Sequence, residues 1–151
     1  MTNNDKQSSM PSLIDLDATF LPVQLMRMVS RVTHLADGAI AAELDLGPRH
    51  WVYPHHFPSD PIFPGTLIIE AAGQVVALWA WVEGQRGRPR LVRASAKFRA
   101  PVETQDSALL IEAAVRRKRH LNFAEVTVRT TRQVVASVSV VLAVVTEEIK
   151  G

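Results

Sequence analysis

The amino-acid sequence predicts an α+β domain in which a curved antiparallel sheet wraps around one long, wholly buried helix. Three observations support this prediction. Residues 66–82 form a stretch of about four helical turns that is apolar on nearly every side, and segments rich in Val, Ile and Thr lie before and after it. No segment supplies a second amphipathic helix. Because a helix that is apolar all round needs cover on every side, a single curved sheet is the simplest way to bury it.

Composition limits the classes of protein to consider. The chain has 151 residues, of which 47% are hydrophobic and 21% charged, as expected for one globular domain. It contains no cysteine, which excludes disulfides, thiolate metal sites and cysteine nucleophiles. The formal net charge of +2 is too small to indicate a class of partner by itself.

The N-terminal residues and the most apolar stretch indicate neither secretion nor a membrane span. Residues 1–10 are polar and lack the apolar stretch of a secretory signal, so we expect a disordered tail followed by one domain at residues 11–151. The most apolar stretch is interrupted by Glu70 and Gln74, both of which are costly in a bilayer. We therefore expect a cytoplasmic protein with no membrane association.

The first half of the chain divides into two strands and a loop. Residues 25–35 and 39–46 are apolar-rich runs joined by Ala36-Asp37-Gly38, which indicates strand, turn and strand. Residues 54–65 then hold four of the nine prolines. Proline fixes φ and removes a backbone donor, so this segment is predicted to be a rigid, irregular loop.

The second half is predicted to be a helix followed by four strands. The helix at residues 66–82 stops near Gly84 and Gly87. The strand segments are residues 91–102, 108–117, 121–129 and 133–145, and the last alternates most clearly between apolar and small polar side chains. Turns at residues 117–120 and 130–132 predict an antiparallel meander. Two strands, a loop, one buried helix and four strands make up the hotdog architecture.

A candidate acid–base site lies where the loop meets the helix. Glu70 is the first ionisable side chain of the helix, and burying an unpaired carboxylate is expensive. Gln74 follows one turn later on the same face and can hydrogen-bond to it directly or through water. His56 lies on the rigid loop upstream, so an imidazole, a carboxyl and a helix N-terminus come together. A structural role for Glu70, as a hydrogen-bonded core group, stays equally open on these grounds.

The remaining histidines give no support to a metal site. His55 and His56 are adjacent, and adjacent side chains in an extended chain point to opposite faces. His34, His50 and His120 have no recognisable partner and are expected at surface or strand positions. We predict no metal and no cofactor.

The run from His56 to Gln74, HFPSDPIFPGTLIIEAAGQ, resembles the signature of the 3-hydroxyacyl-acyl carrier protein dehydratases. That signature is H-F-P-G-x-P-x-x-P-G, then four residues, then an acidic residue and Ala. A weaker similarity, to a K-F-R-x-P-V strand, continues at residues 97–102, and the resemblance covers most of residues 20–145. It implies dehydration of (3R)-3-hydroxyacyl thioesters to trans-2-enoyl thioesters.

The resemblance also implies roles for single residues. His56 would be the base and Glu70 the acid, supplied by different subunits of a homodimer, with a trimer of dimers left open. The Gly65 N–H would polarise the thioester carbonyl, and Gln74 would support the acid. The residues that would shape the loop around His56 are Phe57, Pro58, Pro61 and Pro64.

Several positions depart from the family pattern. Ser59 stands where the family usually has Gly, and Phe63 where Met is commoner. Ser59 bears on the loop conformation after Pro58, whereas Phe63, with Trp51 and Tyr53 just upstream, predicts an acyl tunnel of different shape. These departures favour a specialised pathway, such as polyketide or another secondary lipid synthesis, over core fatty acid synthesis. Glu rather than Asp at position 70 resembles the branch that dehydrates without isomerising the double bond.

Two basic clusters admit two interpretations each. One interpretation is an ordinary surface that faces solvent. The other is a docking site whose positive charge attracts an acidic acyl carrier protein. Neither has the interleaved aromatic residues of a nucleic-acid site. Their members are Arg116, Arg117, Lys118 and Arg119 in one, and Arg86, Arg88, Arg90 and Arg93 in the other.

Two further functions remain open beside dehydration. One is another thioester reaction on the same scaffold, by a thioesterase or a coenzyme A hydratase, since a fold does not fix a reaction. The other is a noncatalytic acyl-binding partner of a true dehydratase.

Overall fold

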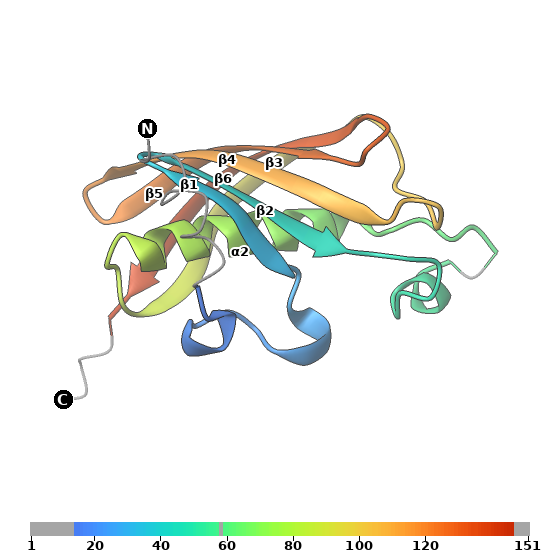
Figure 1. Cartoon of the computed structure of the whole chain (residues 1–151). Helices are drawn as coiled ribbons and strands as arrows, with labels where there is room; N and C mark the ends of the chain where they lie inside the picture. Colours follow the sequence, from blue (N-terminus) through green and yellow to red (C-terminus); the bar gives the residue numbers. More distant parts are fainter. Residues whose placement is uncertain (1–13, 58, 147–151) are drawn as a thin grey trace, which may run out of the picture.

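A computed structural model describes residues 14–57 and 59–146, and it has the predicted hotdog fold (Figure 1). One helix lies along the concave face of a six-stranded antiparallel sheet. The predicted tail at residues 1–10 lies outside the described residues. The strands are β1 Arg31–Ala36, β2 Ala39–Asp45, β3 Arg88–Phe98, β4 Ala108–Lys118, β5 Leu121–Arg129 and β6 Val134–Val145, the helix is α2 Gly65–Val82, and short 3-10 turns are η2 Leu16–Ala18, η3 Gln24–Met26 and η4 Tyr53–His55.

The strand order corrects one prediction. The order is β1-β2-β4-β5-β6-β3, so only β4, β5 and β6 form the meander, while β3 pairs with β6 at the edge of the sheet. The connection between β3 and β4, residues 99–107, is too long for a tight hairpin and contains Pro101. The chain therefore crosses the sheet and brings β4 beside β2.

The first strand begins later than predicted. Of residues 25–35, only those from Arg31 onward join the sheet, and the segment before them contains η3. Its backbone is bound by a helix side chain instead: the Met28 N–H donates to Gln74 Oε1 and the Met26 carbonyl accepts from Gln74 Nε2. The predicted turn after β1 is present, with Gly38 at a φ of 70°.

Sequence signals fix both ends of α2. The Pro64 carbonyl accepts from the Leu67 and Ile68 N–H groups and so starts the helix. At the other end Gly84 has a φ of 94°, and the N–H groups of Gly84 and Gln85 donate to Trp81 and Ala80. This is a Schellman ending, which needs a residue that tolerates a positive φ.

The prediction that α2 is wholly buried is wrong for this single chain. The face toward the sheet is buried, but a stripe on the opposite face stays partly exposed. The helix is long and apolar enough to cross a membrane, yet half of its residues are packed inside the protein, as in a core helix. The stripe consists of Thr66, Ile69, Glu70, Gly73, Ala77 and Trp81.

The core fills the space between α2 and the sheet. Alternate side chains of the central strands point inward, such as Leu109 and Ile111 of β4, and are fully buried. They meet Val75, Val76 and Leu78 on the buried face of α2. Each such side chain contributes about 1.5–3 kcal/mol to stability, so the core holds α2 firmly while its opposite face stays open.

Candidate active site

His56 is held in one tautomer by the proline-rich loop. It follows η4 and is half-buried, and its Nδ1 lies 3.0 Å from the Ile62 carbonyl oxygen. A carbonyl oxygen only accepts hydrogen bonds, so Nδ1 carries the proton in the neutral ring. The lone pair is then on Nε2, which is the nitrogen able to take a proton from a substrate.

The loop is anchored at Ile62, Phe63 and Tyr53. The Phe63 N–H donates to the Val102 carbonyl at 2.9 Å, and Ile62 forms an isolated bridge with Glu103. The Tyr53 hydroxyl donates to the Glu103 carbonyl at 3.2 Å. These contacts fix the carbonyl that orients His56.

The predicted loop-shaping residues differ in their surroundings. Phe57 is exposed, with its ring centroid 4.2 Å from that of His56. Pro64 is buried and caps α2, whereas Pro61 is exposed. Pro58 lies outside the described residues. Of the four, Phe57 touches the histidine and Pro64 sets where the helix begins.

Glu70 and Gln74 form the hydrogen bond that their spacing predicts. Gln74 Nε2 donates to Glu70 Oε2 at 2.8 Å and to the Met26 carbonyl at 2.8 Å, while Gln74 Oε1 accepts from the Met28 N–H at 2.7 Å. The two backbone partners fix which end of the amide is the donor. Glu70 Oε2 is therefore an acceptor, and Oε1 is the oxygen that remains for a ligand.

Gly65 opens α2 at a point of close packing. Neither its N–H nor that of Thr66 donates to another backbone carbonyl among residues 14–57 and 59–146. A Cβ at position 65 would come within 2.8 Å of the Phe98 ring. Glycine is thus the residue that lets the β3 aromatic ring lie against the first turn of the helix.

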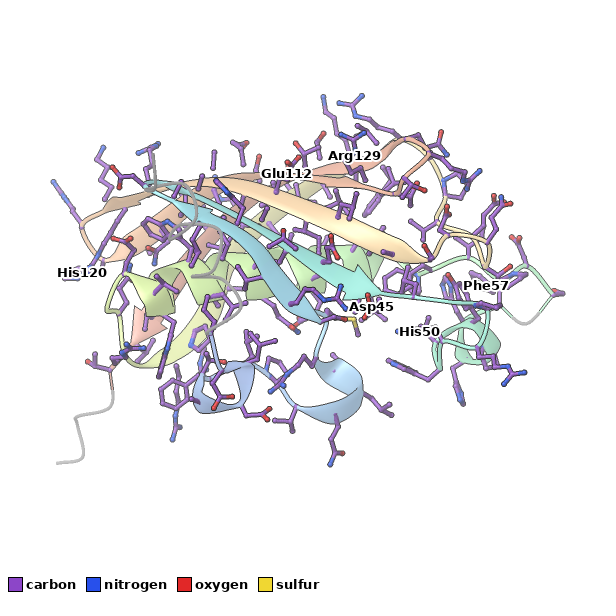
Figure 2. All side chains as sticks on the ribbon, viewed as in Figure 1. Asp45, His50, Phe57, Glu112, His120 and Arg129 are labelled. Carbon is purple, nitrogen blue, oxygen red and sulfur yellow. The ribbon has the colours of Figure 1, made fainter. Side chains whose placement is uncertain are left out.

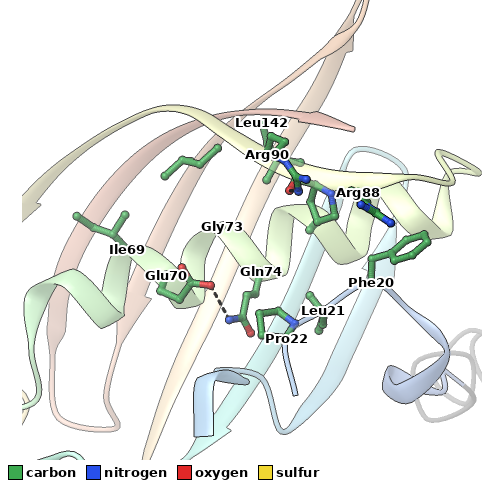
Figure 3. Close-up of a pocket in the computed structure, with 13 residues that line it drawn as sticks. Phe20, Leu21, Pro22, Ile69, Glu70, Gly73, Gln74, Arg88, Arg90 and Leu142 are labelled. Atoms are coloured by element: carbon green, nitrogen blue, oxygen red, sulfur yellow. Dashed lines mark hydrogen bonds between the residues drawn. The ribbon is translucent and has the colours of Figure 1, made fainter. Parts of the chain in front are cut away.

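A pocket of about 420 Å³ runs along the exposed stripe of α2. Glu70 and Gln74 lie on one part of it, and Phe20 lies toward the far end (Figure 3). Apart from Glu70 and Gln74, its helix residues are small or apolar, and β3 supplies two arginines at the rim. It is lined by Phe20, Leu21, Pro22, Ile69, Glu70, Gly73, Gln74, Ala77, Arg88, Pro89, Arg90, Leu91 and Leu142.

The structure does not place all predicted site residues on this pocket. Glu70 and Gln74 line it, whereas His56 and Gly65 do not. Sequence reasoning missed Gly73 and Ala77, although their spacing of three and seven residues from Glu70 places them on the same helix face. It also missed Phe20, which comes from a segment that no motif marks.

The aromatic residues expected to shape an acyl tunnel lie elsewhere. Trp51, Tyr53 and Phe63 do not line the pocket but surround the ring of His50, with ring centroids 5.7, 6.2 and 5.6 Å away. Their role in this chain is to pack the base of the loop. Whether they shape a tunnel shared by two copies stays a prediction.

Comparison with known families decides the relationship of this chain. Residues 21–139 match the FabA-like domain. The chain belongs to the FabA-like domain family. This match spans both halves of the candidate site, from the segment that binds Gln74 to β6.

Solved structures agree with the fold of this FabA-like domain. One is the dehydratase heterocomplex ApeI:P from Xenorhabdus doucetiae, at 17% identity and a TM-score of 0.72, covering 89% of this chain and 93% of that one. Another is zebrafish thioesterase superfamily member 2, at 14% identity and a TM-score of 0.63, covering 80% and 84%. Both show that the fold is shared, and they belong to proteins named for different reactions.

Charges around the loop are set by burial and by one ion pair. Burial lowers the pKa of His50, which is half-buried and whose Nδ1 accepts from the Val52 N–H at 3.2 Å. Burial, reinforced by the charge of Asp106, raises the pKa of Tyr53 to about 12. Two hydrogen bonds from Arg132 hold the pKa of Asp106 below its usual value, and Asp106 in turn accepts from the Glu103 N–H.

The basic hairpin, which is the turn between β4 and β5 with the basic residues 116–119, lies far from the proline-rich loop that carries His56. The turn between β4 and β5 is at one end of the molecule, marked by His120, while Phe57 marks the other end (Figure 2). The helix α2 starts near the Phe57 end. The arginines and lysine at residues 116–119 are exposed, with the Arg116 guanidinium 4.9 Å from the centre of the Phe123 ring.

No group of three His, Asp or Glu side chains gathers as metal ligands would within the part of the chain that the structure describes.

Proposed function

We propose that this FabA-like domain dehydrates (3R)-3-hydroxyacyl thioesters carried on acyl carrier protein to trans-2-enoyl thioesters. The observation that carries the proposal is the pairing of Glu70 with Gln74 at an otherwise mostly apolar pocket. A carboxyl with one oxygen fixed as an acceptor and the other open to a ligand suits an acid that protonates a leaving hydroxyl. The tautomer of His56 provides the matching base.

The proposed step removes water without any other reactant. His56 Nε2 takes a proton from C2, and that electron pair forms the C2–C3 double bond. The 3-hydroxyl leaves as water with the proton from Glu70 Oε1. During the step, negative charge grows on the thioester carbonyl oxygen. In the proposed site the Gly65 N–H donates a hydrogen bond to this oxygen without rearrangement. His56 ends protonated and Glu70 ends as a carboxylate, so a proton transfer restores the site.

The site needs a second copy of the chain to be complete. Glu70 faces the pocket and His56 does not line it, so we propose a homodimer in which each copy supplies His56 and Gly65 to the other copy's Glu70. Strand β3 is an edge of the sheet and exposes more than half of the Leu91, Val92 and Phe98 side chains. An unpaired edge with exposed apolar residues supports pairing between two β3 strands.

Such pairing also supports a role for the basic hairpin. In an antiparallel pair of β3 strands, a twofold rotation relates the two copies, so their β3 strands run in opposite directions. The hairpin of one copy then lies at the end where the other copy's helix begins. We propose that it docks an acidic acyl carrier protein and so delivers the thioester to that site. The residues of this docking surface are Arg116, Arg117, Lys118 and Arg119.

The experiment that tests the proposed reaction follows both substrate and product. The purified protein is incubated with a 3-hydroxyacyl carrier protein, and the enoyl product and any free acid are measured by mass spectrometry. We expect enoyl product from the wild type and a loss of at least a hundredfold in His56→Ala and in Glu70→Gln. His55→Ala is the matched control, since it changes the neighbouring imidazole.

Each other result identifies a different function. Release of free acid would indicate a thioesterase instead. A folded wild type that neither dehydrates nor hydrolyses the substrate would indicate a noncatalytic acyl-binding partner.

A further inference from the structure

We infer that Phe20 and Gly73 set the length of the acyl chain that this protein accepts, and that the limit is a chain of medium length. The inference rests on the proposed function, because it assumes that the pocket beside Glu70 receives the substrate chain. It concerns two residues outside the acid–base pair. One stands at the end of the pocket and the other on its floor.

The chemistry fixes the direction in which the chain runs. Glu70 must face the hydroxyl on C3, so C3 lies at the Glu70 part of the pocket. The carbons beyond C3 need an apolar surface, and the stripe of α2 offers it at Gly73 and Ala77, one and two turns further along. Figure 3 shows Phe20 at the far end of this path from Glu70.

Gly73 keeps the floor of the pocket open. A Cβ at this position would meet nothing within 4 Å apart from neighbouring helix backbone, and its φ is not in the left-handed region. Packing and backbone conformation therefore do not require glycine here. Glycine inside a helix costs about 1 kcal/mol of stability relative to alanine. In return, the absence of a side chain at position 73 leaves space in the pocket.

Phe20 stands at the far end of the pocket, with 51% of the residue exposed in the single chain. Its ring meets the Trp81 ring edge-on, with centroids 5.7 Å apart, and the Arg86 guanidinium lies 3.7 Å from the centre of the Trp81 ring. Phe20 and Ala77 also line a neighbouring void, which measures about 10 Å³ and is too small for a chain. We infer that space for the chain ends at the edge-to-face pair of Phe20 and Trp81.

The segment that carries Phe20 is itself fixed. Leu21 is buried in the core, and Arg27 Nε donates to the Pro22 carbonyl at 3.0 Å. The same segment continues to the backbone groups bound by Gln74. Phe20 is thus held by the same part of the chain that positions Glu70.

The helix gives the scale of the limit. From Glu70 to Ala77 the helix rises about 10 Å, which matches about eight extended carbons beyond C3, so the predicted limit is an acyl chain of about eleven carbons. Chains longer than this would have to displace Phe20.

The test separates binding from catalysis by using saturated acyl-pantetheine thioesters, which cannot be dehydrated. Their dissociation constants are measured by calorimetry for chains of four to sixteen carbons. For the wild type we expect affinity to rise about fourfold per added carbon and to stop rising near the predicted length. Turnover of the 3-hydroxyacyl series should show the same limit.

Two substitutions should move the limit in opposite directions. In Phe20→Ala the rise in affinity should continue into longer chains, because the ring that ends the pocket is gone. Gly73→Val should weaken the longest accepted chain by at least tenfold and leave the four-carbon chain unchanged, since branched carbons would fill the floor. Val23→Ala, an exposed neighbour that does not line the pocket, is the control and should match the wild type.

The outcomes separate this inference from the proposed reaction. If affinity shows a length limit that moves in Phe20→Ala or Gly73→Val, the inference stands even where no dehydration occurs. If the wild type dehydrates all lengths equally and neither variant changes the binding series, the inference is overturned while the reaction stands. Should Phe20→Ala fail to fold, the wild-type limit and Gly73→Val decide the matter alone.

Discussion

At the scale of single residues, the site depends most on the amide of Gln74. It is 4% exposed and bonds to Glu70 and to the backbone of Met26 and Met28. Because both the nitrogen and the oxygen of its amide form hydrogen bonds, Gln74 connects Glu70 to the segment before β1, which lines the pocket. One side chain thus serves both packing and the orientation of Glu70.

We predict that Gln74→Leu lowers the free energy of unfolding by about 2–4 kcal/mol, because the buried Met28 N–H and the part-buried Met26 carbonyl lose their partner. Urea unfolding followed by fluorescence measures this change. Gln133→Leu, at an exposed position, should change it by less than about 0.5 kcal/mol. Equal effects of the two substitutions would show that the Gln74 hydrogen bonds contribute little.

We predict that His50 makes the stability of the fold depend on pH. Its folded-state pKa is lowered from 6.5 by burial, so its neutral form contributes stability that is fully present above pH 6.5. That contribution is lost as the pH falls below 6.5 toward the folded-state value. In His50→Asn, whose side-chain oxygen can still accept from the Val52 N–H, stability should fall less than in the wild type between pH 7.5 and 5. Parallel urea curves for the two proteins over that range would contradict the assignment.

At the scale of secondary-structure elements, local sequence patterns predict most of the helices and strands. They do not predict features that depend on contacts between distant parts of the chain. The proline spacing and the helix ends are local, and the structure confirms an irregular segment before the helix and a helix ending before Gly84. The position of β3 beside β6 and the turn η3 depend on the β3–β4 crossing and on Gln74, so no local pattern reveals them. Likewise, motif spacing brought Glu70 and Gln74 together, whereas Phe20 joins the pocket only through folding.

A buried amide pair joins the end of the helix to the sheet. Gln85 and Asn122 exchange two hydrogen bonds of 2.8 and 2.9 Å, and Asn122 Nδ2 also donates to the Leu142 carbonyl. Both side chains are buried. The pair therefore ties the residues after α2 to the start of β5.

We predict that Asn122→Leu destabilises the protein by about 2–3 kcal/mol, since it leaves the Gln85 amide buried without a partner. The double variant with Gln85→Leu should recover part of that loss, because both polar groups are then gone. A double-mutant cycle by thermal and urea unfolding measures the coupling. Strict additivity of the two single losses would contradict a direct interaction.

At the scale of the whole molecule, the open stripe of α2, the edge of β3 and the basic hairpin all point to partners. A single chain leaves Leu91, Val92 and Phe98 exposed and separates its own hairpin from its helix N-terminus. The proposed dimer covers these exposed β3 side chains. It also brings the basic hairpin of one copy beside the site of the other copy. The carrier protein is then the partner that the hairpin would bind.

We predict that reversing charge in Arg116→Glu/Arg117→Glu raises the KM for a carrier-bound substrate at least tenfold at low salt and leaves the KM for a pantetheine thioester unchanged. The control is Arg129→Glu, which reverses an exposed charge of the same sheet away from the hairpin. Equal changes for both substrates would place the effect in the site and not in docking.

The central claim is that His56 of one copy and Glu70 of another complete one site, and a heterodimer of His56→Ala and Glu70→Gln chains tests it most directly. The two chains are coexpressed with different tags and purified through both. Each parent homodimer should be inactive, while the heterodimer should keep about half of the wild-type activity, because one of its two sites retains both groups. A heterodimer as inactive as its parents, beside an active wild type purified in the same way, would contradict the claim.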